Sequence, residues 1–189
     1  ARSAHAQSTD ELKVVLIGCG GRGTGAVHNC LSSVDNVKLI AVADAFEDRA
    51  RGALSSAKSK FESKVDVPDE RVFVGFDAYE KAIASGVDMV ILATPPGFRP
   101  MHYKAAIEAG KHVFMEKPCC TDAAGYRSLL ESNKLADEKS LKVGVGLQRR
   151  HQAQPVGGEL RREYRHRQDG RRPLPGAAGE ALHHVGIAD

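Results

Sequence analysis

Two short stretches carry residues whose types and spacing suit chemistry. "GCGGRG" puts Gly18, Gly20 and Gly23 in the spacing GxGxxG, and "EKP" sets a lysine, Lys117, between a glutamate and a proline. Glycines at this spacing let a backbone approach a pyrophosphate closely, and the N–H groups of a following helix bind its oxygens. A lysine side chain can give a proton as the ammonium or take one as the amine. The two stretches therefore predict a pyrophosphate site and an acid–base group.

Asp44 is the residue expected to select the ligand that carries the pyrophosphate. It ends the apolar run "VKLIAVAD", close to where a ribose-binding acid follows a glycine loop. A carboxylate there accepts hydrogen bonds from both ribose hydroxyls of NAD and repels the 2′-phosphate of NADP. The alternative makes Asp44 only a cap for the next helix. We favour NAD. NADP stays open as the weaker candidate, because Arg49 and Arg51 follow closely and a nearby arginine suits a 2′-phosphate.

Short apolar runs alternate with helical segments from Leu12 to about Leu147, and this pattern must position the two motifs. Strands are expected at 13–18, 37–44, 71–75, 87–94, 112–116 and 141–147. Helices are expected at 22–33, 47–63, 77–85, 99–110 and 122–138, with Asp77 and either Thr121 or Asp122 as N-caps and Gly110 closing its helix. The order predicts an α/β fold, a doubly wound parallel six-stranded sheet of the Rossmann type.

Ligands of an open parallel sheet bind outside the carboxyl ends of its strands. "TPP" (94–96) ends the fourth expected strand and "EKP" (116–118) ends the fifth. Both should therefore face the nicotinamide end of a bound dinucleotide, with Lys117 close to the reacting carbon. Pro118 fixes the turn and could be cis. The alternative is an ordinary strand-to-helix turn with a surface lysine, and spacing alone does not separate the two.

Taken together, residues 12–151 resemble the N-terminal domain of the Gfo/Idh/MocA oxidoreductases, the glucose–fructose oxidoreductase and inositol dehydrogenase family. The matching pieces follow in order: "VVLIGCGGRG", "AVAD", "VDMVILATPP", the histidine of "FRPMHYKAAIEAGKHV", and "EKP". "GCGGRG" with "GLQRRH" is most similar to members that carry twin-arginine export signals. Those members include NAD-dependent glycosidases as well as dehydrogenases.

The resemblance implies a role for each matching residue. The pyrophosphate would be held by Gly18, Gly20, Gly21, Arg22 and Gly23. The adenosine ribose would be held by Asp44, with Arg49 nearby. The nicotinamide side would be lined by Thr94, Pro95 and His102, the nicotinamide ribose would contact Glu116, and Lys117 would be the catalytic or substrate-binding lysine. Gln148 and Arg149 would lie at the passage into a second domain. A packed histidine is the alternative for His102.

The function implied is an NAD-dependent oxidoreductase of sugars or polyols, with hydride transfer at a carbinol carbon. An NAD-dependent glycoside hydrolase and a non-catalytic NAD-binding module are the alternatives. The family's C-terminal α+β domain has no counterpart in this sequence, so we expect a chain that binds NAD but is inactive alone. Full-length members pair into homo-oligomers through that domain, and the oligomeric state here is left open.

Composition excludes several other classes. The net charge of +3 and the 5% aromatic content, with no Trp, argue against a nucleic-acid partner. No apolar run approaches the roughly 20 residues of a membrane helix, and no Cys/His cluster has metal-site spacing. Residues 1–11 are expected to be a disordered leader. Ala4-His5-Ala6 has the form of a signal-peptidase site, so cytoplasmic and periplasmic locations both stay open.

The segment 152–189 differs in composition and periodicity from the rest of the chain. It contains six Arg, six Gly and three Pro, and its aliphatic residues follow neither helical nor strand periodicity. We expect an irregular tail, disordered or non-native, after a dinucleotide-binding domain at 12–151.

Overall fold

The computed structural model describes residues 11–33 and 35–147, and a parallel sheet forms its centre. The strands are β1 (Leu12–Ile17), β2 (Val37–Asp44), β3 (Val72–Val74), β4 (Met89–Leu92), β5 (His112–Met115) and β6 (Val143–Val145). They lie in the order β3-β2-β1-β4-β5-β6, and every neighbouring pair is parallel. This order confirms the predicted doubly wound Rossmann sheet, with the chain reversing its direction of winding between β1 and β4.

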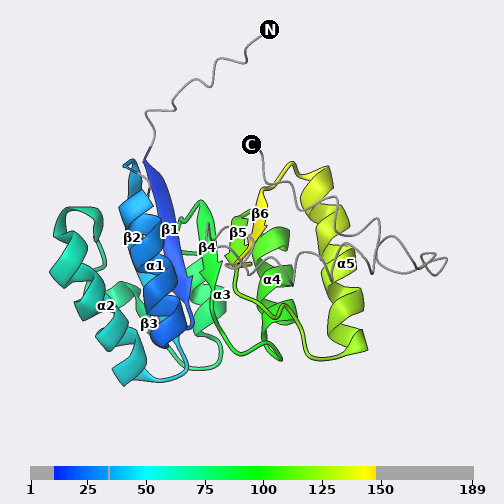
Figure 1. Ribbon diagram of the computed structural model, residues 1–189, viewed down its shortest axis with the longest axis horizontal. Helices are drawn as coiled ribbons and strands as arrows, with labels where there is room; N and C mark the ends of the chain where they lie inside the picture. Colours follow the sequence, from blue (N-terminus) through cyan, green and yellow to red (C-terminus); the bar gives the residue numbers. More distant parts are fainter. Residues whose placement is uncertain (1–10, 34, 148–189) are drawn as a thin grey trace, which may run out of the picture.

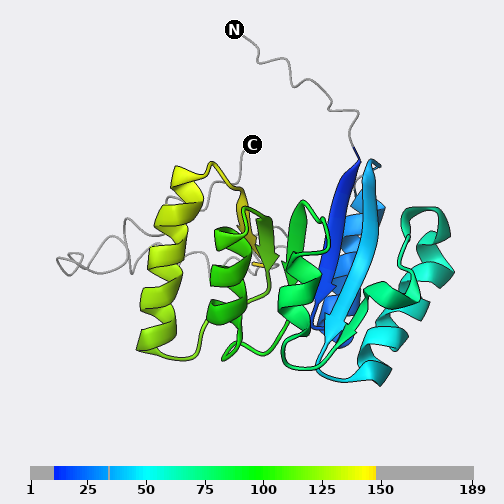
Figure 2. The ribbon, with the colours of Figure 1, turned by 180° about the vertical axis from the view of Figure 1, so that it is seen from behind.

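Helices cover both faces of the sheet. Figure 1 shows α1 (Gly21–Ser33) and α2 (Glu47–Phe61) in front of the half that contains β1, β2 and β3. The view from behind shows α3 (Ala78–Ile83), α4 (Arg99–Glu108) and α5 (Ala123–Glu138) along the other face (Figure 2). Two short 3-10 turns, η1 (Glu62–Lys64) and η2 (Asp69–Arg71), join α2 to β3. Sequence periodicity did not predict these turns, since each is only three residues long.

The central strand β1 is buried on both sides, as its unbroken apolar run predicts. Val14 and Leu16 belong to the core beneath α1 and α2, and Val15 and Ile17 belong to the core beneath α3, α4 and α5. None of the four is more than 2% exposed. Burial of an aliphatic side chain stabilises the fold by about 1.5–3 kcal/mol, so β1 holds the two layers together.

Most predicted caps are present. The Asp122 carboxylate accepts a hydrogen bond from Gly125 N at 2.6 Å and caps α5. Gly110, with a φ of +72°, ends the turn after α4. Asp77 does occupy the N-cap position of α3, but its carboxylate makes no capping hydrogen bond and instead pairs with Lys81 at 2.7 Å. The predicted N-cap position of Asp77 is therefore confirmed, but its side chain does not cap the helix, because a lysine one turn away competes for the carboxylate.

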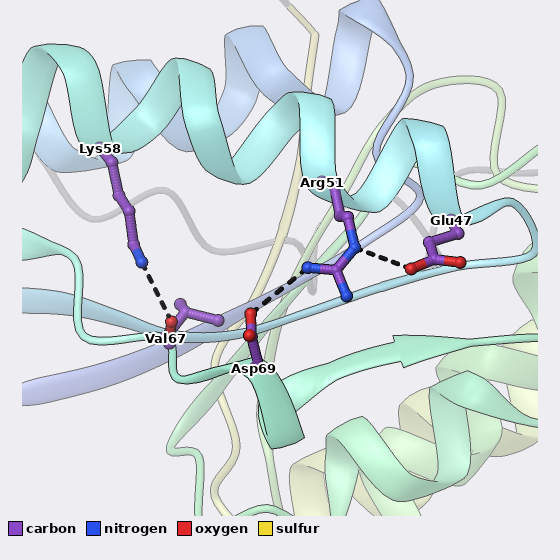
Figure 3. A network of polar contacts seen from close by, with 5 residues as sticks. All are labelled: Glu47, Arg51, Lys58, Val67 and Asp69. Atoms are coloured by element: carbon purple, nitrogen blue, oxygen red, sulfur yellow. Dashed lines mark hydrogen bonds and ion pairs between the residues drawn. The ribbon is translucent and has the colours of Figure 1, made fainter.

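Polar contacts tie α2 to the segment that leads into β3 (Figure 3). Arg51 donates to Glu47 Oε1 at 2.7 Å within the helix and to Asp69 Oδ1 at 3.3 Å across to η2. Lys58 Nζ donates to the carbonyl of Val67 at 3.3 Å. The Arg51 pairs are exposed to solvent, which screens their charges, so they contribute little to stability. They direct Arg51 toward the edge of the sheet.

Candidate dinucleotide-binding site

A cavity of about 790 Å³ lies at the carboxyl ends of the central strands. It brings together the predicted residues Gly18, Gly20, Arg22, Asp44, Arg49, Thr94, Pro95, His102, Glu116 and Lys117. Gly21 and Gly23 belong to the same loop but do not line the cavity. Gln148 and Arg149 lie outside the described residues, as do most of the expected leader and all of the expected tail. The sheet topology thus collects residues that are up to a hundred positions apart.

The glycines of the loop serve two different purposes. A Cβ on Gly23 would lie 1.9 Å from the carbonyl oxygen of Gly18, and one on Gly18 would lie 2.5 Å from Thr94 N. Gly18 also has a φ of +93°, which side chains rarely adopt. These two glycines let α1 and β4 pack closely against the loop. A Cβ on Gly20 would have no neighbour nearer than 3.9 Å and one on Gly21 none within 4 Å, so space above the loop is open for a ligand.

Asp44 faces the glycine loop from the end of β2. Its Oδ2 accepts a hydrogen bond from Cys19 N at 2.6 Å, and its Oδ1 accepts one from Phe46 N at 3.0 Å. The N-cap of α2 is Phe46 rather than Asp44. Two backbone donors therefore hold the carboxylate at the cavity wall, where its remaining lone pairs can accept from a ligand. Cys19 is not reactive here, because burial, reinforced by the Asp44 charge, raises the pKa of its thiol to about 12.

An ion pair crosses the cavity floor between α1 and the end of β5. Arg22 Nη2 donates to Glu116 Oε1 at 2.6 Å, and Glu116 is only 2% exposed. A Cβ on Gly146 would lie 2.8 Å from both carboxylate oxygens, so the backbone after β6 closes over Glu116. Arg22, predicted to hold a pyrophosphate, thus also anchors the glutamate predicted to contact the nicotinamide ribose.

Thr94 and His102, both predicted to line the nicotinamide side, lie next to each other. Thr94 Oγ1 lies 3.1 Å from His102 Nδ1, and the His102 ring lies against Tyr79 with 4.3 Å between ring centroids. The histidine is 6% exposed. Burial, with a smaller contribution from the Arg99 charge, lowers the pKa of His102 to about 4. The imidazole is therefore neutral near pH 7 and can form a neutral hydrogen bond with the threonine hydroxyl.

Lys117 follows Glu116 at the cavity edge. Its side chain is exposed, whereas Glu116 before it is buried. The Lys117–Pro118 peptide bond is cis, which is one of the two isomers that the sequence left open. The lysine thus lines the cavity while its ammonium remains in contact with water.

Arg99 is the site residue that sequence reasoning missed. It is the first residue of α4 and only 3% exposed. Its guanidinium donates to the carbonyls of Thr94, Glu116 and Pro118. Burial lowers the pKa of Arg99, while Cys119 and Glu116 act in the opposite direction. An arginine before a proline at a helix start carries no sequence signal for burial, because arginine is usually exposed.

The two arginines that follow Asp44 differ in their surroundings. Arg49 lines the cavity beside Gly20. Arg51, expected near the ribose as well, is held by Glu47 and Asp69 and does not line the cavity. Three phenylalanines that no motif indicated also line it, and all are exposed: Phe46, Phe76 and Phe98. Exposed aromatic rings around a cavity are typical of a surface that a ligand covers.

Other site types find no support in residues 11–33 and 35–147. No group of three His, Cys, Asp or Glu side chains in these ranges could hold a metal ion. None of the helices described there has the length and apolar character needed to cross a membrane.

Known proteins with the same architecture were found by sequence and by structure. An inositol 2-dehydrogenase from Klebsiella pneumoniae (strain 342) is 29% identical over 133 residues, which are 70% of this chain and 36% of that protein. A glycosyl hydrolase family 109 protein 2 from Shewanella sp. (strain ANA-3) is 33% identical over 139 residues, 70% of this chain and 28% of that protein. The chain therefore spans about a third of the length of these relatives.

A solved structure has the same fold at lower identity. Scyllo-inositol dehydrogenase from Lactobacillus casei, with bound cofactor NAD(H) and scyllo-inositol, superposes with a TM-score of 0.56 at 21% identity. The match covers 85% of this chain and 42% of that one. A family model described as "Oxidoreductase family, NAD-binding Rossmann fold" matches residues 12–147. The glycine loop, the sheet order and these matches agree, and the chain belongs to the Gfo/Idh/MocA oxidoreductase family through its NAD-binding Rossmann fold.

Proposed function

We propose that this chain binds NAD as part of an oxidoreductase that oxidises sugars or polyols at a carbinol carbon. The observation that carries the proposal is the position of Asp44. Its carboxylate is held at the end of β2 by two backbone N–H groups and borders the same cavity as the glycine loop and Lys117. An acid at this position suits a ribose diol and disfavours a 2′-phosphate.

The described residues fit a dinucleotide. The open space above Gly20 and Gly21 leaves room for a pyrophosphate next to the first N–H groups of α1. The cavity, about 790 Å³, is within the range of small-molecule sites. The loop 18–23 would hold the pyrophosphate, with Gly20, Gly21 and Arg22 beside it and Gly18 and Gly23 keeping the loop close to its neighbours. Asp44 and Arg49 would hold the adenosine end, and Thr94, Pro95, His102 and Glu116 the nicotinamide end. We propose that the dinucleotide-binding domain runs from 12 to 151, as predicted.

Bound NAD supplies a hydride acceptor at nicotinamide C4. Lys117 acts on the proton: its ammonium can donate to, or its amine accept from, the hydroxyl of the reacting carbon. The neutral His102 keeps the Thr94 hydroxyl oriented, and the Arg22–Glu116 ion pair fixes the glutamate beside the lysine. Since Lys117 is exposed, water reaches the reaction site in this chain, and we propose little turnover by the chain alone.

Calorimetric titration with NADH and NADPH tests the cofactor assignment. We expect NADH to bind more tightly than NADPH to the wild-type protein. Asp44→Ala should weaken the binding of NADH at least tenfold, about 1.4 kcal/mol, because the acceptor for the ribose hydroxyls is removed. The affinity for NADPH should stay the same or improve, because the negative charge that repels its 2′-phosphate is also removed.

A matched control is available at the amino ends of the central strands, opposite the cavity. Asp88 Oδ2 accepts a hydrogen bond from Lys13 N at 2.8 Å, so Asp88→Ala also removes an acceptor from a backbone N–H, far from the cavity. It should leave both affinities unchanged. If neither cofactor binds the wild type, or if Asp44→Ala and Asp88→Ala behave alike, the assignment is incorrect.

A glycoside hydrolase that uses NAD transiently is the second candidate, favoured by the Shewanella relative. Both candidates need the same lysine and the same cofactor. Absorbance at 340 nm during turnover of a glycoside separates them. Net accumulation of NADH supports the dehydrogenase, whereas sugar release without accumulation supports the hydrolase.

A further inference from the structure

Arg99 is a buried cation at the end of the cavity proposed for nicotinamide. Burying a guanidinium is costly unless acceptors meet its N–H groups. Arg99 is 3% exposed, and it meets this requirement with backbone carbonyls rather than with a carboxylate. The placement of those carbonyls shows what the residue holds.

Two of the acceptors flank Lys117. Arg99 Nη1 donates to the carbonyl of Glu116, immediately before the lysine, and to the carbonyl of Pro118, immediately after it. The backbone of Lys117 is therefore fixed on both sides by one nitrogen. Arg99 Nη2 donates to the carbonyl of Thr94, at the end of the neighbouring strand β4.

The planar fork of the guanidinium makes this arrangement rigid. Because both nitrogens belong to one flat group, the Thr94 carbonyl and the two carbonyls around Lys117 are held at a set separation. Nε of Arg99 is buried without a hydrogen-bond partner among the described residues. The protein bears the cost of this unsatisfied donor while the two Nη atoms keep their hydrogen bonds. A lysine could keep the charge but not the fork.

We propose that Arg99 is a positioning residue, which sets where Lys117 lies relative to Thr94 and hence to the nicotinamide. The inference rests on the proposed function for the identity of the ligand. The geometry that it invokes does not depend on a cofactor, so the two can be tested separately.

The ligand test compares NADH with ADP-ribose, which lacks the nicotinamide. In wild-type protein NADH should bind more tightly than ADP-ribose. Arg99→Lys should weaken the binding of NADH at least tenfold and change the affinity for ADP-ribose by less than twofold, because only the nicotinamide end of the site is disturbed. Arg71→Lys is the matched control: it makes the same chemical change in η2, outside the cavity, and should change neither affinity.

A rescue experiment separates positioning from general loss of structure. Arg99→Ala leaves the carbonyls without donors, and methylguanidinium added at millimolar concentration should restore the preference for NADH over ADP-ribose at least in part. Equal weakening of both ligands in Arg99→Lys, or a preference retained within twofold, would overturn the proposal.

A measurement without ligand tests the positioning role of Arg99 by itself. It remains informative if the wild type binds neither nucleotide, a result that would disprove the proposed function. Backbone amide order parameters of Lys117 and Thr94 should fall in Arg99→Lys, while those of Gly20 and Asp44 stay at wild-type values. Unchanged order at Lys117, or a loss of order in all four amides alike, would show that Arg99 does not position the lysine.

Discussion

His102 shows how burial sets the charge of a single side chain in this cavity. The imidazole is enclosed by Tyr79 and Thr94 and lies near the Arg99 cation. Desolvation and that positive charge both disfavour the imidazolium. The residue predicted to line the nicotinamide side is also well packed, so the two interpretations offered for it are compatible.

The lowered pKa of His102 predicts a pH dependence of folding. The unfolded chain binds a proton near pH 6.5, but the folded protein binds it only near pH 4. Between these values the unfolded state holds more protons, so stability rises with pH. The contribution of neutral His102 is complete above about pH 6.5 and is lost as the pH falls toward 4. At about 1.4 kcal/mol per pH unit, the full change is roughly 3 kcal/mol.

Urea unfolding from pH 4 to 7.5 measures this effect. His102→Gln should flatten the rise in unfolding free energy relative to wild type. His28→Gln is the comparison. The pKa of His28 is lowered chiefly by desolvation, but that histidine is only half-buried between α1 and α2, so its variant should remove a smaller part of the slope. Parallel curves for wild type and His102→Gln would contradict the prediction.

At the scale of elements, α4 and α5 end with the same hydrogen-bond pattern but with different residues. After α4, Gly110 N donates to Ile107 O and Lys111 N donates to Ala106 O. After α5, Ser140 N donates to Asp137 O and Leu141 N donates to Ala136 O. This is the Schellman pattern, which requires a left-handed residue. Gly110 has a φ of +72° and Ser140 a φ of +56°, so the serine carries a cost that the glycine avoids.

Ser140→Gly should therefore stabilise the protein by about 1 kcal/mol, since relief of the left-handed strain exceeds the extra backbone entropy of glycine. Gly110→Ser is the reciprocal variant. A Cβ there meets nothing within 4 Å, so its cost of about 1 kcal/mol should come from the backbone alone. Denaturant midpoints of the two variants should move in opposite directions, and a shift in the same direction would exclude this explanation.

At the scale of the whole molecule, the cavity joins distant parts of the chain. Residues of the loops after β1, β2, β3, β4 and β5 line the cavity. It therefore forms only when both halves of the sheet are assembled. A ligand bound there interacts with the folded state and not with the unfolded chain. Binding must then raise global stability by mass action.

NADH at a hundred times its measured Kd should raise the unfolding free energy by about 2.7 kcal/mol. For a folded domain of this size that corresponds to roughly 8 °C in the thermal midpoint. NADPH at the same concentration should give a smaller shift, and the Asp44→Ala protein should lose about half of the NADH shift or more, as a tenfold loss of affinity requires. A midpoint that NADH leaves unmoved would indicate that the cavity is not the binding site.

The sequence by itself determined which elements form and in what order. The apolar run of β1, the glycines after it and the alternation of strands with helices are local patterns, and they predicted a six-stranded parallel sheet correctly. The family followed from motifs that stand in sequence order, and residues 12–147 match it. Boundaries were less accurate: 141–147 was expected as a strand, whereas β6 covers only Val143–Val145.

Only the tertiary structure decided which side chains reach one another. The burial of Arg99, its three carbonyl acceptors and the Arg22–Glu116 ion pair depend on residues brought together across the ends of different strands. No periodicity or spacing encodes such contacts, because they arise when separate βαβ units pack side by side. Local propensity depends on neighbours in the chain, whereas the charge and orientation of a buried group depend on neighbours in space.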